Sequence, residues 1–220
     1  MDHDADDMLA TIALHLLDTA AETGVHALSP DVERALLAVP RDRFLPPSYR
    51  DEAWRDSALP IGYGQTISQP FIVALMTQLL APSAGQRVLE VGSGCGYQLA
   101  VLAQIVDAAF GIERVPELAE QSAGTLHALG YGNARVRTGD GYEGWPEEQP
   151  FDGILVTAAG GDVPEPLKRQ LRVGGRLVLP VEDAHGWQHL VVVERHGKER
   201  FSERKVLGVR FVPLLRARGG

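Results

Sequence analysis

Three polar side chains stand at the carboxyl ends of predicted strands: Glu113, Asp140 and Thr157. In a doubly wound sheet, ligands bind outside the carboxyl ends of the strands. An ionised carboxylate accepts hydrogen bonds through two oxygens, so Glu113 could hold both hydroxyls of a ribose and Asp140 an adenine amino group. Either acid alone is more often a solvated loop residue, but their appearance at successive strand ends favours a binding site.

A glycine turn marks the most specific of these strand ends. The apolar run Val88–Val91 leads into Gly92, Gly94 and Gly96, and a helical pattern begins directly afterwards. Glycine adopts backbone angles that other residues resist, and its missing side chain lets a ligand lie against the main chain. With Glu90 two residues before the first glycine, the spacing G-x-G-x-G resembles the cofactor loop of S-adenosylmethionine-dependent methyltransferases. It matches the dinucleotide fingerprint G-x-G-x-x-G poorly, and the alternative interpretation is a tight turn without a ligand.

Strand and helix patterns alternate from residue 87 onward. Strands are predicted at 87–91, 108–112, 134–138, 153–156 and 176–181. Helical patterns follow the first, second and fourth of them, up to about residue 106, at 116–129 and at 165–171. The last two apolar runs, 190–194 and 206–212, lack a helix between them and predict an antiparallel hairpin. The sequence therefore predicts an α/β fold: a doubly wound, mostly parallel sheet with an antiparallel C-terminal edge hairpin, as in Rossmann-like methyltransferases.

Two amphipathic patterns precede this sheet. One predicts a helix over 8–20 with Asp6 or Asp7 as its cap, and Ser29 followed by Pro30 predicts the start of a second helix. Residues 41–60 have little periodicity and are expected to be loop. We expect a single methyltransferase domain over 1–220, with a helical N-terminal cap at 1–60 and a cofactor-binding sheet core at 61–220.

Ser68 has a structural interpretation of its own. It precedes a clear helical run from Phe71 to Leu80, with Pro70 close behind. Serine is a preferred N-cap residue, and proline is favoured at the first helical position. By this local pattern alone, Ser68 caps a helix and has no further role.

The composition narrows the class of function. The chain has 220 residues, 45% of them hydrophobic, and a net charge of −8, which argues against nucleic acid as the main partner. Its one cysteine, Cys95, cannot form an internal disulfide and fits a reducing compartment. Without a paired base, Cys95 is interpreted as a small side chain that fills the glycine turn. The acidic start and the lack of a long apolar run predict a cytoplasmic protein without a membrane partner.

Metal chemistry and hydrolase chemistry find little support in the sequence. His185 and His189 are spaced like ligands on one helix face, but Gly186 lies between them and a strand begins near His189, so we expect no metal site. The chain has neither the G-x-S-x-G elbow of a hydrolase nor a Walker lysine after its glycines.

Several motifs together resemble the protein-L-isoaspartate O-methyltransferase family. The similar segments are Leu59–Pro70, Val88–Gln98, Gly139–Gly141, Pro164–Leu171, Gly174–Pro180 and Phe211–Leu214. Many methyltransferases share the glycine turn, whereas Gln65–Pro70 is far more specific to this family. The resemblance therefore makes Ser68 a candidate site residue as well as a candidate helix cap.

The resemblance implies a reaction, a cofactor and a set of site residues. The family transfers a methyl group from S-adenosylmethionine to the free carboxylate of L-isoaspartyl residues in damaged proteins or peptides, leaving S-adenosylhomocysteine. The ester then collapses to a succinimide, whose hydrolysis restores some normal aspartate. By resemblance, Ser68 is the active-site serine. The residues implied around the cofactor are Ile61, Gly62, Tyr63, Gly64, Gln65, Glu90, Gly92, Ser93, Gly94, Gly96, Glu113, Arg114, Asp140, Gly141 and Thr157.

The residues suit this chemistry. A carboxylate is already ionised near pH 7 and needs no general base, so a serine hydroxyl has only to position it. Three alternatives remain: a relative that methylates an aspartate in one dedicated peptide, a methyltransferase acting on RNA or a small molecule, and an adenosyl-binding module without turnover. The negative charge and the segment Thr66–Ser68 count against the second, and the intact glycines, Glu113 and Ser68 count against the third.

Overall fold

A computed structural model describes residues 2–216 of the chain. Its centre is a seven-stranded sheet in the order β5-β4-β3-β6-β7-β8-β9. The first five strands of that order are mutually parallel, and the last two pair antiparallel at one edge, which confirms the predicted fold class. The bounds are β3 Arg87–Val91, β4 Ala108–Glu113, β5 Ala134–Thr138, β6 Phe151–Val156, β7 Leu171–Glu182, β8 Gln188–Arg195 and β9 Phe201–Val209.

Helices cover both faces of the sheet, which is why its central strands are mostly apolar. Along β3, Val88 contributes to one buried cluster and the next residue, Leu89, to a second cluster on the opposite face. The first cluster also receives the apolar residues of the N-terminal helices. The helices of this part are α3 Pro70–Leu80, α4 Tyr97–Ala103, α5 Pro116–Ala128 and α6 Glu165–Gln170.

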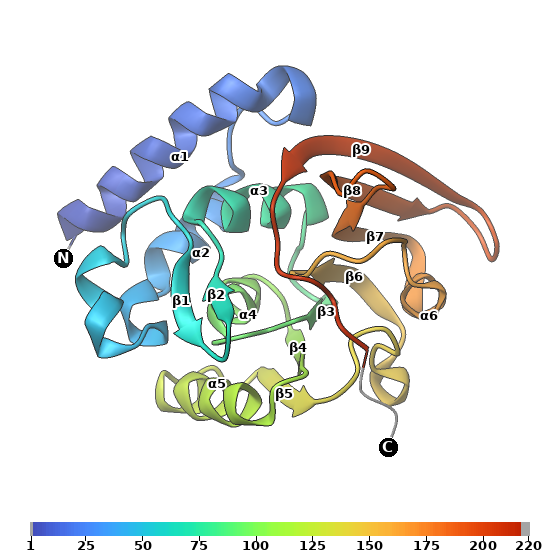
Figure 1. Cartoon of the computed structure of the whole chain (residues 1–220). Helices are drawn as coiled ribbons and strands as arrows, with labels where there is room; N and C mark the ends of the chain where they lie inside the picture. The colour runs from blue at the N-terminus through green and yellow to red at the C-terminus, as the bar shows by residue number, and fades with distance from the viewer. Residues whose placement is uncertain (1, 217–220) are drawn as a thin grey trace.

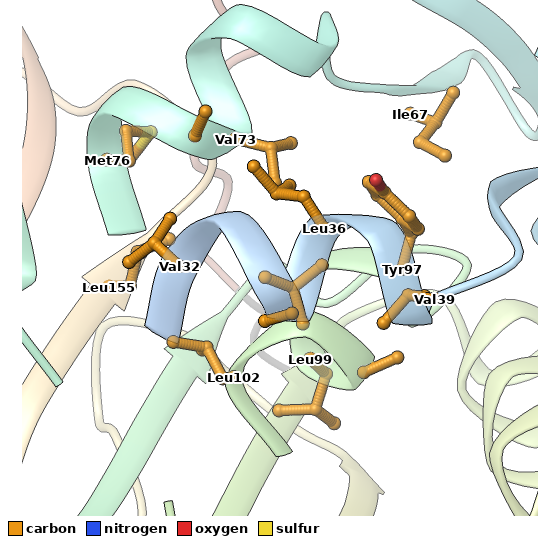
Figure 2. Close-up of a cluster of buried hydrophobic side chains, with 14 of the residues drawn as sticks. Val32, Leu36, Val39, Ile67, Val73, Met76, Tyr97, Leu99, Leu102 and Leu155 are labelled. Atoms are coloured by element: carbon orange, nitrogen blue, oxygen red, sulfur yellow. The ribbon is translucent and has the colours of Figure 1, made fainter. Parts of the chain in front are cut away.

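The N-terminal helices pack onto the sheet's helical layer. α1 (Asp2–Thr23) contacts α3 and β9, and α2 (Pro30–Ala38) contacts α3 and α4. Figure 2 shows α2 crossing this buried cluster, with Val32 and Leu36 among its side chains. Ser29 caps α2 as predicted, since its hydroxyl accepts from the backbone N–H of Val32 at 3.4 Å. The predicted caps Asp6 and Asp7 were wrong, because α1 already begins at Asp2.

Residues 41–60 are more ordered than the sequence predicted. Two short 3₁₀ helices, η1 (Arg41–Phe44) and η2 (Pro47–Glu52), occupy this stretch, and β1 (Leu59–Gly62) pairs antiparallel with β2 (Gln65–Ile67) in a separate two-stranded sheet. The expectation of a loop missed these elements because turns of this length leave no periodicity. The expected division at residue 60 falls inside β1.

Two predicted elements end earlier in the structure than the sequence predicted. The helix after the glycine turn stops at Ala103 instead of Val106, and β9 stops at Val209 instead of Val212. Beyond β9 the chain turns back past the strands toward the C-terminus (Figure 1), and Ala159 anchors it through a backbone N–H to Val212 O at 2.8 Å. None of the helices within residues 2–216 has the length and apolar character needed to cross a membrane. The remaining residues of the expected domain, 1 and 217–220, lie outside the described part of the chain.

Candidate functional site

The glycine turn has a backbone that side chains would not permit. Gly92 and Gly94 have φ angles of 85° and 51°, in the left-handed region that favours glycine. A Cβ on Gly92 would lie 2.9 Å from Thr157 Oγ1, and a Cβ on Gly94 would lie 3.2 Å from Ile61 Cδ1. The turn is therefore fixed by close packing from β6 on one side and from the β1–β2 hairpin on the other.

Glu113 holds the turn from the neighbouring strand. Its Oε2 accepts from the backbone N–H of Gly94 at 2.8 Å, and its Oε1 accepts from that of Val115 at 2.9 Å. The side chain is buried, yet each carboxylate oxygen has a second lone pair. Glu113 can thus organise the loop and still accept hydrogen bonds from a ligand hydroxyl.

Glu90 and Ser93 each have a buried polar atom without a hydrogen-bond partner among the described residues, and both residues line the same cavity. The two atoms are Oε2 of Glu90 and the hydroxyl oxygen of Ser93. Burial raises the pKa of Glu90 well above its usual value, and the nearby charge of Glu113 raises it further. Native proteins rarely bury such atoms unpaired, so these two atoms indicate that a polar ligand completes the site.

These groups line one cavity at the carboxyl ends of β3, β4 and β6, called here the inner cavity. Of the residues predicted from the sequence, it brings together Gln65, Ser68, Glu90, Gly92, Ser93, Gly94, Glu113, Arg114, Gly141 and Thr157. Gly141 admits no side chain, since its Cβ would lie 2.4 Å from Val91 Cγ1. Ten of the sixteen residues predicted from the sequence therefore lie in the lining.

Six predicted residues lie outside the lining of the inner cavity. Ile61 packs behind Gly94, Gly62 ends β1, and Tyr63 and Gly64 form the turn of the β1–β2 hairpin. Gly96 caps α4 and faces α5, where its Cβ would meet Ser122 at 3.2 Å. The carboxylate of Asp140 accepts from the backbone N–H of Tyr142 at 2.9 Å.

The lining also includes residues that the sequence analysis did not name as a site. The C-terminal segment contributes positions 212–215, and the start of α4 contributes Tyr97 and Gln98. The apolar motif at 211–214 was the available signal for the first group. That motif did not predict a binding site, because apolar side chains that line a cavity follow no characteristic sequence pattern.

Ser68 does not cap α3, so that prediction was wrong. The N-cap position is Gln69, whose side chain makes no bond to the helix. The acceptor at the helix start is instead Asp56, whose Oδ1 accepts from the backbone N–H of Phe71 at 2.7 Å. Asp56 lies far from this helix in sequence, so the local pattern gave no sign of it.

Ser68 instead lies where two spaces meet. It lines the inner cavity and also a wider groove, called here the outer groove, which encloses about 900 Å³. Thr66 and Thr157 line both spaces as well. The outer groove runs between α1, the start of α3 and the β8–β9 edge, with Trp187 among its residues. Val212 lines both spaces too, so three hydroxyl side chains and one apolar side chain lie where the groove meets the inner cavity.

A family model for protein-L-isoaspartate(D-aspartate) O-methyltransferase matches residues 13–219. The chain belongs to this family. A relative named protein-L-isoaspartate O-methyltransferase 2, from Syntrophobacter fumaroxidans, is 50% identical over 196 residues, covering 89% of this chain and 79% of the relative. Another from Methylorubrum populi is 55% identical over 185 residues, covering 84% of this chain and 86% of the relative.

Solved structures agree with this family membership. A protein-L-isoaspartate O-methyltransferase structure superimposes with a TM-score of 0.81 at 28% identity, covering 98% of this chain and 66% of that one. A Plasmodium falciparum structure, described as a putative member in complex with S-adenosyl-L-homocysteine, has a TM-score of 0.79 at 23% identity, with 95% and 99% covered. The second likeness concerns the fold alone. The family match favours none of the alternative functions considered from the sequence.

Proposed function

We propose that this chain transfers a methyl group from S-adenosylmethionine to the free carboxylate of L-isoaspartyl residues in proteins or peptides. Family membership supports the reaction. The observation that carries the assignment of roles is the position of Ser68, which lines both the inner cavity and the outer groove. In this proposal the inner cavity holds the cofactor and the outer groove holds the peptide.

The inner cavity suits an adenosyl cofactor by the chemistry of its lining. Glu113 would accept from the ribose hydroxyls, and the unpaired oxygen of Glu90 would accept from the amino group of the methionine part. Gly92 and Gly94 let the ligand lie against the main chain. When bound, the cofactor supplies an electrophilic methyl group on a sulfonium. Asp140 remains a candidate partner of the adenine amino group.

The protein's contribution to the reaction is position. The acceptor carboxylate is ionised near pH 7, so no residue has to remove a proton. The Ser68 hydroxyl donates a hydrogen bond to one carboxylate oxygen and thereby aims the other oxygen into the inner cavity. Holding reacting groups in line is worth roughly 7–11 kcal/mol in favourable cases. Ser68 therefore acts by orientation and forms no covalent bond.

The partner in this proposal is an isoaspartyl-containing peptide or protein, with no requirement for nucleic acid, membrane or metal. Among the described residues, no group of three His, Cys, Asp or Glu side chains is arranged to hold a metal ion. We also propose a cytoplasmic location. The single cysteine of the chain supports it, because proteins of oxidising compartments more often carry disulfides.

Methyl transfer to paired peptides tests the proposal. The wild-type protein should label an isoaspartyl peptide from radiolabelled S-adenosylmethionine and leave the normal aspartyl peptide of identical sequence unlabelled. Ser68→Ala should lower kcat/KM for the peptide by roughly 10–100-fold, with the calorimetric Kd for S-adenosylhomocysteine near that of the wild type. Transfer to neither peptide would refute the function, and an equal loss of cofactor affinity would return Ser68 to a structural role.

A further inference from the structure

Arg41 is a buried arginine whose guanidinium contacts backbone carbonyls. The residue is fully buried at the start of η1. Its Nε donates to Ala53 O at 2.8 Å, and its Nη2 donates to Ser68 O at 2.8 Å and to Ser57 O at 3.4 Å. Burying a charge is costly unless it is well paired. One of the three carbonyls that pair with this buried charge belongs to Ser68, which suggests that Arg41 does more than fill space.

The same guanidinium also reaches the wall of the inner cavity. Its Cζ lies 4.8 Å from the centre of the Tyr97 ring, within cation–π range. Tyr97 is the first residue of α4 and lines the inner cavity. Figure 2 shows Tyr97 in the same buried cluster as Val39 and Ile67. The ring of Phe44 in η1 packs edge-on against it at 5.7 Å between centroids. Arg41 thus joins the Ser68 turn to the element that follows the glycine turn.

A second buried side chain fixes the same turn from its other end. Asp56 accepts from the backbone N–H of Phe71 and, through Oδ2, from Gln69 Nε2, both at 2.7 Å. The side chain of Asp56 is 6% exposed. The turn from Ser68 to Phe71 is therefore held at its carbonyl end by Arg41 and at its amide end by Asp56.

We infer that Arg41 is a positioning residue for Ser68, an inference that rests on the proposed function. The planar guanidinium fork fixes the Ser68 carbonyl relative to Ala53 and the Tyr97 ring. The bond to the Ser68 carbonyl fixes the peptide plane that follows Ser68, and with it the Cα–Cβ direction from which the hydroxyl reaches the two spaces. Lysine keeps the charge but lacks the fork, so it cannot hold these partners at once.

Arg41→Lys is the test, with Asn133→Ala as the matched control. The Asn133 amide also donates to two backbone carbonyls, of Ala103 and Val106, both at 2.9 Å, but at the amino ends of the strands. We expect Arg41→Lys to lower kcat/KM for the isoaspartyl peptide by roughly 10–100-fold, with the Kd for S-adenosylhomocysteine within about twofold of the wild type. Asn133→Ala should lower the melting temperature and leave kcat/KM unchanged.

Amide hydrogen exchange gives a readout that needs no activity. In Arg41→Lys, exchange in a peptide covering residues 66–72 should speed up, while exchange in β3 stays at the wild-type rate. If Arg41→Lys does not fold, the same measurements are made on Arg41→Gln, whose side-chain amide can still donate hydrogen bonds but carries no charge.

The outcomes separate this inference from the proposed function. An inactive wild-type protein would refute the function, and exchange at 66–72 would then decide whether Arg41 holds the turn. An active wild type with unchanged kcat/KM and unchanged exchange in Arg41→Lys would overturn the inference. An equal loss of S-adenosylhomocysteine affinity would also overturn it, because Arg41 would then act through Tyr97.

Discussion

Replacing Asp56 by alanine should destabilise the protein far more than replacing Ser68. The Asp56 carboxylate accepts from the backbone N–H of Phe71 and from the Gln69 side chain, both at 2.7 Å. It also lies 2.7 Å from His15 Nδ1 of α1. Asp56→Ala therefore removes the acceptor at the start of α3 together with a link to α1.

The size of the effect follows from these contacts. Loss of an N-terminal cap costs about 1 kcal/mol, and a buried hydrogen bond to a charged group contributes about 1.5–3 kcal/mol. Gln69 can turn toward the outer groove, so the Phe71 bond dominates and we expect a loss of about 3 kcal/mol. For a chain of this length, that corresponds to a fall in Tm of roughly 6–12 °C.

Urea and thermal unfolding of three variants would measure this. Ser68→Ala should unfold within about 0.5 kcal/mol of the wild type, because the residue lies outside the cap position. Asp56→Asn keeps an oxygen for Phe71 N–H and should recover about half of the loss caused by Asp56→Ala. The m-value should stay constant across the series, which shows that the denatured state is unchanged.

Two results would refute the reasoning. If Ser68→Ala lost as much stability as Asp56→Ala, serine would be the cap in solution and its place in the site would need another basis. If Asp56→Ala changed the free energy of unfolding by less than about 0.5 kcal/mol, the bond to Phe71 N–H would contribute nothing measurable.

Three further predictions concern the glycine turn and its neighbours. Burial raises the pKa of Glu90 in the folded state, so the folded protein favours the protonated carboxyl. The free energy of unfolding is therefore highest below the ordinary pKa of Glu90 and falls as pH rises toward the pKa in the folded protein. Glu90→Gln should therefore raise Tm at pH 8 and change it little near pH 4; a constant difference across pH would contradict this. Gly92→Ala should weaken S-adenosylhomocysteine binding in calorimetry by at least roughly tenfold, since its Cβ would lie 2.9 Å from Thr157 Oγ1; Gly124→Ala, with open space around its Cβ, is the control. Burial raises the pKa of Cys95 to about 11, so iodoacetamide at pH 8 should label the folded protein much more slowly than the urea-unfolded chain; equal rates would contradict this.

The sequence by itself determined the sheet and the edge where the site lies. The bounds predicted for β3 and β5 match the structure. β3 is a central strand that is buried along most of its length and leaves a short apolar run with clear ends. β5 is the exposed edge strand, and its predicted end is marked by the glycine that follows it, Gly139. Glycine spacing predicted the turn after β3, since a left-handed backbone at Gly92 and Gly94 leaves few other choices. Residues at the strand ends, such as Glu113, then came to one edge by the geometry of a parallel sheet.

Only the tertiary structure decided which side chains line the inner cavity and which hold the surrounding fold. Ser68 has the local pattern of a helix cap, but the acceptor comes from Asp56, and Arg41 holds the Ser68 carbonyl from still farther away in sequence. Gly96 looks like part of the binding turn, yet it packs against α5. Local patterns report the conformation of neighbouring residues, whereas these roles depend on contacts between segments that meet only when the chain folds.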